Sequence, residues 1–298
     1  MSAQTRRRKT SFVALFRTTP AHTVCPNFYV LAHANGCGFR PACLYCHLYS
    51  TFWYLDEPQV FSNTEALLQE VRRWIASDNL ECATLNTGNL SDSLNFENLR
   101  PLMGELVELF RREAEAAGRP HILLAVTKAG MEACRPFLER APCRNVVISF
   151  SVNAPEAAHL YELGAAVVED RLEAAARLKA AGWRVRIRID PMIAGFDYAW
   201  IAAQVAALAP ERVTLGALRA EPNLLRRLPR AAKELFSRLN EPDAPKGLAR
   251  YPEDLRLALY RQALARLDGA SLGLCEETPE VWERLGLDQV APSCNCGP

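Results

Sequence analysis

Short apolar runs and amphipathic segments alternate about six times between residues 27 and 216. The runs at 82–87, 145–151 and 184–190 have the length of strands, and helical patterns separate them. Repeated strand–helix units favour a parallel sheet with helices packed outside it. Six units are too few for a closed eight-unit barrel. The sequence therefore predicts an α/β fold, a partial (β/α)6 barrel over residues 21–220.

The two ends of the chain depart from this repeat. Residues 1–20 are basic and polar, with Arg6-Arg7-Arg8-Lys9 among them, and predict a loosely held arm. Residues 221–298 are mostly helical in pattern and end in the tail Ser293-Cys294-Asn295-Cys296. We expect this last segment to be a C-terminal extension that closes the barrel.

The composition narrows the class of protein. Of the 298 residues, 49% are hydrophobic, which is enough for a large core. The net charge of +1 argues against a general polyanion binder, although a local basic face is compatible with it. No apolar run reaches membrane-spanning length, and the first residues lack a secretory signal pattern. We therefore expect a cytoplasmic protein without a membrane partner.

Three of the ten cysteines, Cys37, Cys43 and Cys46, fall within ten residues, directly after the first expected strand. In a cytoplasmic chain, clustered cysteines more often bind metal than form disulfides. A zinc site would need His33 or His47 as a further ligand. A thioredoxin-type redox pair would have no third cysteine so close. An iron–sulfur cluster with three cysteine ligands and one open iron uses all three thiolates.

The position of this loop suggests what the open iron binds. Substrates and cofactors of parallel α/β proteins bind at the carboxyl ends of the strands, where this loop lies. An open iron there can bind S-adenosylmethionine through its amino and carboxylate groups. Electron donation then breaks the sulfonium bond and releases a 5′-deoxyadenosyl radical. We therefore predict two cofactors, a [4Fe-4S] cluster and S-adenosylmethionine.

Motifs over about residues 25–285 support the same chemistry. The cysteine loop has an aromatic, Tyr45, before its last cysteine, and five residues in its first gap. Further motifs are Thr127-Lys128, Ile148–Asn153, Tyr161-Glu162-x-Gly164, Arg171–Ala175, Arg186–Ile193, Arg250-Tyr251 and Cys275–Trp282. Together they resemble the radical S-adenosylmethionine superfamily, and more narrowly the spore photoproduct lyase family, whose usual loop is Cys-x3-Cys-x2-Cys. The resemblance implies a radical-SAM-type partial barrel.

The resemblance implies binding roles for several side chains. The three clustered cysteines would hold the cluster, and Lys128 would neutralise the methionyl carboxylate of S-adenosylmethionine. Short polar side chains after two strands would bind its ribose or amino group. These are Ser149, Ser151 and Asn153 at one strand end, and Asn89, Ser91 and Asp92 at another.

Four further residues are the expected catalytic side chains. Tyr45 matches one tyrosine of the lyase, and His47 stands where the lyase commonly has a second. Arg186 and Arg188 share one face of the strand at 184–190. If that face points inward, two guanidiniums line the site and suit a phosphate or carboxylate. An outward, solvated charged face is the alternative.

One departure from the family pattern leaves the substrate open. The lyase uses a thiol after its second strand to return a hydrogen atom, and Asn89 or Leu90 takes that place here. DNA photoproduct repair is therefore one hypothesis, and the same radical chemistry on a small molecule or peptide is another. A non-catalytic zinc-binding protein is the third. Cys294 and Cys296, with Cys275, could bind a second metal or supply a hydrogen donor, or the tail has no role.

The expected partners follow from the resemblance. A lyase-like enzyme needs a reductant such as flavodoxin or ferredoxin, and we expect a monomer. The basic arm and the arginine-rich segment Arg219–Arg230 favour DNA as substrate. Trp53 and Tyr54, just after the cysteine loop, are aromatics on which a base could stack, or ordinary core residues.

Overall fold

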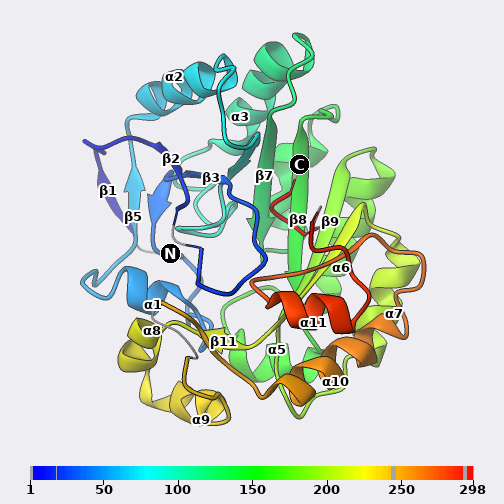
Figure 1. The fold of residues 1–298 in the computed structure, drawn as a ribbon. Coiled ribbons are helices and arrows are strands. Elements are labelled where there is room, and N and C mark those ends of the chain that lie inside the picture. Colours follow the sequence, from blue (N-terminus) through cyan, green and yellow to red (C-terminus); the bar gives the residue numbers. More distant parts are fainter. Residues whose placement is uncertain (1–2, 18, 243–245, 291–293, 298) are drawn as a thin grey trace.

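A single large sheet organises the computed structural model of the protein, which describes residues 3–17, 19–242, 246–290 and 294–297 (Figure 1). Parts of the expected arm, and Ser293 of the tail, lie outside the described residues. The strands of the sheet are β2 (Val13–Leu15), β3 (Tyr29–Leu31), β6 (Thr84–Asn86), β7 (Ile122–Thr127), β8 (Val146–Val152), β9 (Arg184–Met192), β10 (Arg212–Ala217) and β13 (Leu272–Leu274). Their order is β13-β10-β9-β8-β7-β6-β3-β2.

The expected parallel barrel is confirmed. The strands from β3 to β10 pair in parallel, and β13 adds a further parallel strand beside β10. Within the described part of this sheet, the one antiparallel pair is β2 with β3. The sheet is thus open, with β2 and β13 at its two edges. A strand from the C-terminal extension therefore belongs to the barrel sheet itself.

Helices connect the strands and pack on the outer face of the sheet. Their apolar sides share one core with the outward strand residues. These helices are α2 (Thr64–Ile75), α3 (Met103–Phe110), α4 (Arg135–Leu138), α5 (Pro155–Tyr161), α6 (Val168–Ala180), α7 (Ala199–Leu208) and α10 (Glu253–Leu264). In the part of the chain that the structure describes, none of the helices has the length and apolarity needed to cross a membrane.

Two small sheets and four short helices complete the described fold. A second sheet has the order β1-β5-β4, and a third pairs β11 with β12. Their strands are β1 (Gln4–Arg6), β4 (Ala34–Asn35), β5 (Gln59–Phe61), β11 (Arg219–Ala220) and β12 (Ala249–Arg250). The short helices are α1 (Leu48–Thr51), α8 (Pro222–Arg227), α9 (Lys233–Phe236) and α11 (Pro279–Arg284).

The two faces of the sheet differ in chemistry because side chains alternate along each strand. Phe150 of β8 and Ile187 of β9 point outward into the main core. Ser149, Arg186 and Arg188 point to the opposite, inner face, where Ser149 and Arg186 are register partners. Figure 1 shows the C-terminal segment lying over β8 and β9 on this inner face.

The expected loose arm is tied down. Strand β1 pairs with β5, and β2 forms one edge of the main sheet. Phe12 between them is only 3% exposed, and its backbone N–H donates to the Glu70 carboxylate at 2.9 Å. The polar composition of this segment concealed two short strands, since three residues are too few to show an alternating pattern.

The sequence pattern of residues 96–116 predicts one helix, but α3 begins only at Met103. Pro101 disfavours helical backbone at the residue before it. The Glu97 carboxylate then accepts the backbone N–H of Met103 at 3.1 Å and caps the new start. The expected end is reached through the π-helical turn Arg111–Glu115.

Candidate active site

The three clustered cysteines lie on the loop between β4 and α1, beyond the carboxyl end of β3. Cys43 is buried, and Cys37 and Cys46 are partly buried. The Cys37 thiol donates to Asn95 Oδ1 at 3.2 Å. Burial raises the pKa of each thiol, and the charge of Cys46 raises the pKa of the other two. The three thiols thus share one electrostatic environment.

The cysteine loop packs tightly against the segment after α5. A Cβ added to Gly164 would lie 2.3 Å from the Pro41 carbonyl oxygen and 2.6 Å from the Arg40 nitrogen. The Leu44 backbone N–H also donates to the Tyr161 carbonyl at 2.9 Å. Only a glycine allows this approach without displacing the loop. The Tyr-Glu-x-Gly motif therefore positions the cysteine loop.

A buried carboxylate, Glu162, gathers four site residues. Lys128 Nζ lies 3.2 Å from Oε1, and Arg171 Nη1 lies 2.5 Å from Oε2. The Tyr45 hydroxyl donates to Oε1, and the Asn153 amide lies 3.4 Å from it. Burial alone would raise the pKa of Glu162. Lys128, Arg171 and Tyr45 outweigh it and hold that pKa at about 2, so the carboxylate stays charged.

Lys128 connects this carboxylate to the cysteine loop. Its ammonium lies 5.7 Å from the centre of the Tyr45 ring. Its charge opposes the effect of burial and lowers the pKa of Cys43 and Cys46. The Lys128 side chain keeps 16% exposure, so it is not fully enclosed. Glu162 therefore fixes the position of a cation beside the thiols.

Asp92 braces two strand ends. Its carboxylate accepts hydrogen bonds from the Leu94 N–H at 2.9 Å, the Thr127 hydroxyl at 2.9 Å and the Lys128 N–H at 2.8 Å. These bonds join the loop after β6 to the end of β7. The Ser91 hydroxyl is buried without a hydrogen-bond partner among the described residues. Of these two predicted binding residues, Ser91 retains free hydrogen-bonding capacity.

His47 and Asn89 join two loops at the mouth of the barrel. The exposed His47 donates from Nε2 to the Asn89 carbonyl at 3.0 Å. Gly88, the residue before Asn89, passes so close to β7 that an added Cβ would lie 2.6 Å from Cβ of Val126. The structure thus brings Asn89 next to the cysteine loop, through its backbone.

Asn153 uses its amide within the protein. Its Nδ2 donates to the Pro191 carbonyl at 2.9 Å, and its Oδ1 accepts from the Tyr198 hydroxyl at 2.9 Å. Ser151 is buried nearby, and its carbonyl accepts from Arg171 at 2.9 Å. Asn153 therefore orders the end of β8 around Glu162, in place of the open binding role that the sequence predicted.

The C-terminal tail occupies two other predicted residues. Ser149 Oγ donates to Asn295 Oδ1 at 2.6 Å. Arg186 Nη1 donates to the carbonyls of Asn295 and Gly297, each at 2.7 Å, and Nη2 donates to Glu211 at 2.7 Å. Both side chains are fully buried. The structure assigns them to the tail, where the sequence predicted a ribose or an anionic ligand.

Arg188 points inward, which is one of the two orientations that the sequence left open, and its charge is balanced. It pairs with Asp190, which also lies 2.8 Å from Arg219. Arg219 in turn pairs with Glu276 at 2.7 Å. The Cys275 sulfur accepts hydrogen bonds from Arg219 at 3.0 Å and from Arg188 at 3.4 Å. Two guanidiniums thus face two carboxylates and one thiol.

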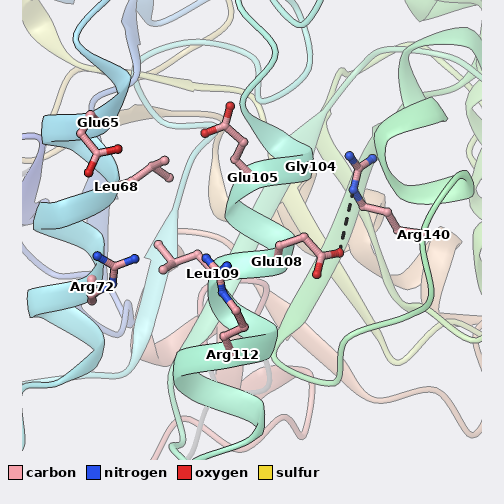
Figure 2. A pocket seen from close by; sticks show the side chains of 9 residues that line it. All are labelled: Glu65, Leu68, Arg72, Gly104, Glu105, Glu108, Leu109, Arg112 and Arg140. Atoms are coloured by element: carbon pink, nitrogen blue, oxygen red, sulfur yellow. Dashed lines mark ion pairs between the residues drawn. The ribbon is translucent and has the colours of Figure 1, made fainter.

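A hollow on the outside of the barrel is separate from these residues (Figure 2). It lies between α2 and α3, and Glu108 and Arg140 pair across one end at 4.0 Å. Its lining residues are Glu65, Leu68, Arg72, Gly104, Glu105, Glu108, Leu109, Arg112 and Arg140. These side chains mix both charges on outer helices, away from the strand ends where the thiols lie.

The donor set at the cysteine loop suits an iron–sulfur cluster better than zinc. Three thiols on one loop are the ligands such clusters use. His33, a candidate zinc ligand, has both ring nitrogens occupied, with Nε2 3.0 Å from the Thr87 carbonyl and Nδ1 3.0 Å from Arg100. Among the described residues, no group of three or more His, Cys, Asp or Glu side chains could hold a single metal ion.

The buried His33 predicts a dependence of stability on pH. Burial, then the Arg100 charge, lowers the pKa of His33 to about 3. In the unfolded chain this histidine binds a proton near pH 6.5. The stability that the neutral, buried His33 contributes is therefore complete above pH 6.5 and is lost as the pH falls toward 3. Urea denaturation should give a free energy of unfolding that falls between pH 6.5 and 4.5. His33→Gln should flatten the dependence of unfolding free energy on pH. The control His159→Gln, at an exposed histidine, should leave that dependence unchanged. An unchanged dependence in His33→Gln would contradict the prediction.

Comparisons with known proteins identify the family of the chain. The family model of spore photoproduct lyase matches residues 3–208. No curated protein matches the chain in sequence. A solved spore photoproduct lyase complexed with dinucleoside spore photoproduct is 17% identical, with a TM-score of 0.69 over 91% of this chain and 82% of that one. A mutant spore photoproduct lyase with bound AdoMet and dinucleoside spore photoproduct is also 17% identical, with a TM-score of 0.64 over 80% and 74%. The chain therefore belongs to the spore photoproduct lyase family of radical S-adenosylmethionine lyases.

Proposed function

We propose that the chain binds a [4Fe-4S] cluster through Cys37, Cys43 and Cys46 and acts on a thymine photoproduct in DNA. When bound, the cluster and S-adenosylmethionine supply a 5′-deoxyadenosyl radical that abstracts hydrogen from the substrate. The observation that carries the proposal is the Lys128–Glu162 pair fixed beside the thiols at the strand ends. A fixed cation there suits the carboxylate of the cofactor.

The residues of this chain would then have distinct tasks. Lys128 would bind the cofactor carboxylate, and Glu162 would hold the ammonium in place. Ser91, buried and unpartnered, has a hydroxyl available for a polar group of the cofactor. Tyr45 belongs to the cysteine loop, and its hydroxyl, which donates to Glu162, would keep the carboxylate oriented. A low-potential protein such as flavodoxin or ferredoxin would supply the electron.

An aromatic and basic surface beside the site supports a nucleic-acid substrate. Trp53 and Tyr54 follow α1 and are 59% and 58% exposed. Arg227 of α8 lies over the Trp53 ring at 4.1 Å. Helices α1 and α8 pack side by side (Figure 1). Exposed rings can stack on bases, and a neighbouring guanidinium can meet a phosphate. The relatives with bound dinucleoside spore photoproduct suggest the same substrate class.

A small molecule or peptide is the second candidate substrate. The tail fills the part of the inner face around Ser149 and Arg186. The remaining inward arginine, Arg188, already faces Asp190. This leaves less open surface for a large substrate on the inner face. The same radical chemistry on a smaller substrate would therefore also suit the barrel.

Turnover of a defined lesion distinguishes these substrates. We expect the reduced, reconstituted protein to convert a DNA oligonucleotide that carries the spore photoproduct, and Trp53→Ala to weaken binding of that oligonucleotide by roughly tenfold. Trp200→Ala, at an exposed tryptophan of α7, is the matched control and should bind normally. Fluorescence anisotropy measures binding, and chromatography measures the product. No conversion, together with equal binding by both variants, would favour the smaller substrate.

A further inference from the structure

A second group of thiols gathers on the inner face of the barrel, apart from the cysteine loop. Its members are Cys25 near the N-terminus, Cys275 after β13, and Cys294 and Cys296 on the tail. Cys25 and Cys294 each raise the pKa of Cys296, after the larger effect of burial. No step described above uses any of these four thiols.

The tail that carries two of them is fixed in place. Asn295 accepts from Ser149 and from Arg186, through its side chain and its carbonyl respectively. Arg212 donates to the Cys294 carbonyl at 3.4 Å. Three strands, β8, β9 and β10, thus contribute a side chain that binds the tail. The Cys-Asn-Cys sequence is therefore docked on the sheet, and its thiols have defined positions.

Cys296 differs from its neighbours in what surrounds its sulfur. The Cys275 sulfur accepts hydrogen bonds from two guanidiniums. Burial raises the pKa of Cys294, and the backbone N–H groups of Cys296 and Gly297 oppose that effect. Cys296 instead packs on an apolar wall of β7 and β8. This wall consists of Ile122, Leu124, Val126 and Val147. Cys296 is partly exposed, whereas Cys294 is buried.

We propose that Cys296 is the hydrogen-atom donor for carbon radicals formed in this barrel. The proposal rests on the radical chemistry proposed above and adds the residue that returns a hydrogen atom to the carbon radical. The S–H bond of Cys296 breaks homolytically, and its hydrogen forms a new C–H bond on the radical carbon. The sulfur is left as a thiyl radical. It returns to the thiol by taking one electron from the low-potential reductant that serves the cluster and one proton from solvent.

The surroundings of Cys296 suit this role. Hydrogen-atom donation requires the protonated thiol, and burial, followed by the charge of Cys294, raises the pKa of Cys296 well above its ordinary value. Cys296 packs on a wall that includes Val126 of β7, and Lys128 follows that strand directly. Asn89 and Leu90, at the mouth of the barrel, offer no such thiol.

Deuterium transfer from solvent tests the donor without any nucleic acid. The reduced, reconstituted protein is incubated with S-adenosylmethionine in D2O, free of added thiols, and 5′-deoxyadenosine is analysed by mass spectrometry. The exchanged Cys296 thiol should deliver deuterium to this product. Cys296→Ala should lower the deuterated fraction of 5′-deoxyadenosine at least fivefold. The control Cys82→Ala, which removes a thiol just before the amino end of β6, should leave that fraction unchanged. An unchanged fraction in Cys296→Ala, or the same loss in Cys275→Ala alone, would overturn the proposal.

Alkylation of the protein without cofactors tests the docked tail independently. In the native protein, N-ethylmaleimide should label Cys296 at least tenfold more slowly than in urea, as measured by peptide mass spectrometry. Asn295→Ala removes the bond to Ser149 and should speed labelling of Cys296 while Cys82 keeps its rate. Equal labelling of Cys296 in native and unfolded protein would overturn the docked position. Deuterium transfer without conversion of the DNA lesion would reject the substrate proposal and leave this one standing.

Discussion

Replacing Cys43 with alanine is expected to remove most of the iron and to abolish formation of 5′-deoxyadenosine. Cys43 is the most buried of the three loop thiols and lies under the influence of Lys128. With two thiolates left, the loop cannot hold the cluster through three ligands. We expect iron in the reconstituted protein to fall from about four atoms per chain to below about one. Colorimetric iron and sulfide measurements check this.

A matched control separates ligand loss from the loss of a buried cysteine. Cys143 is also buried, but it lies in the core outside the sheet. Cys143→Ala should keep its iron and its 5′-deoxyadenosine formation, with a modest loss of stability from the small cavity. If Cys43→Ala retained full iron content, the proposed ligand set would be wrong.

Replacing Glu162 with glutamine is expected to cost about 3–5 kcal/mol of unfolding free energy, because it leaves buried charges unpaired. Glu162 is fully buried and pairs with Arg171, which is 1% exposed, and with Lys128. Glu173→Gln is the control, since its pair with Arg177 is exposed and should contribute less than about 1 kcal/mol. Urea denaturation at pH 7 measures both. A loss as small as that of the control would show that the buried network is not required.

The same variant should also weaken cofactor binding. Without the carboxylate, Lys128 loses the partner that fixes its ammonium beside the cysteine loop. We expect the KM for S-adenosylmethionine to rise more than kcat falls, since positioning of the cation is affected and the cluster ligands are not. A fall in kcat alone, with KM unchanged, would place Glu162 in the chemical step instead.

The strands of the barrel could be predicted from the sequence because they are buried on both faces. The run 145–151 contains Val146, Val147, Ile148 and Phe150, and β8 occupies Val146–Val152. β13 was missed because it has three residues and relies on its pairing with β10. The later start of α3 depends on the Glu97 cap, a contact that apolar periodicity does not reveal.

The site could be predicted only where it is local in sequence. The cysteine loop and Lys128 were found from spacing and motif, and the structure brings them together. Glu162 is 117 residues from Tyr45, so the sequence offered only its place in the Tyr-Glu-x-Gly motif as a signal. Ser149 and Asn295 are 146 residues apart, and no local pattern links them. Tertiary packing alone shows that the tail is the partner of the inward side chains.

Cleavage of S-adenosylmethionine by the reduced, reconstituted protein tests the central claim most directly. The protein is assembled anaerobically with iron and sulfide, reduced with dithionite, and mixed with S-adenosylmethionine. We predict formation of 5′-deoxyadenosine that requires the reductant and is absent in Cys43→Ala. Protein that carries its full cluster and yet forms no 5′-deoxyadenosine, with or without lesion-containing DNA, would contradict the account.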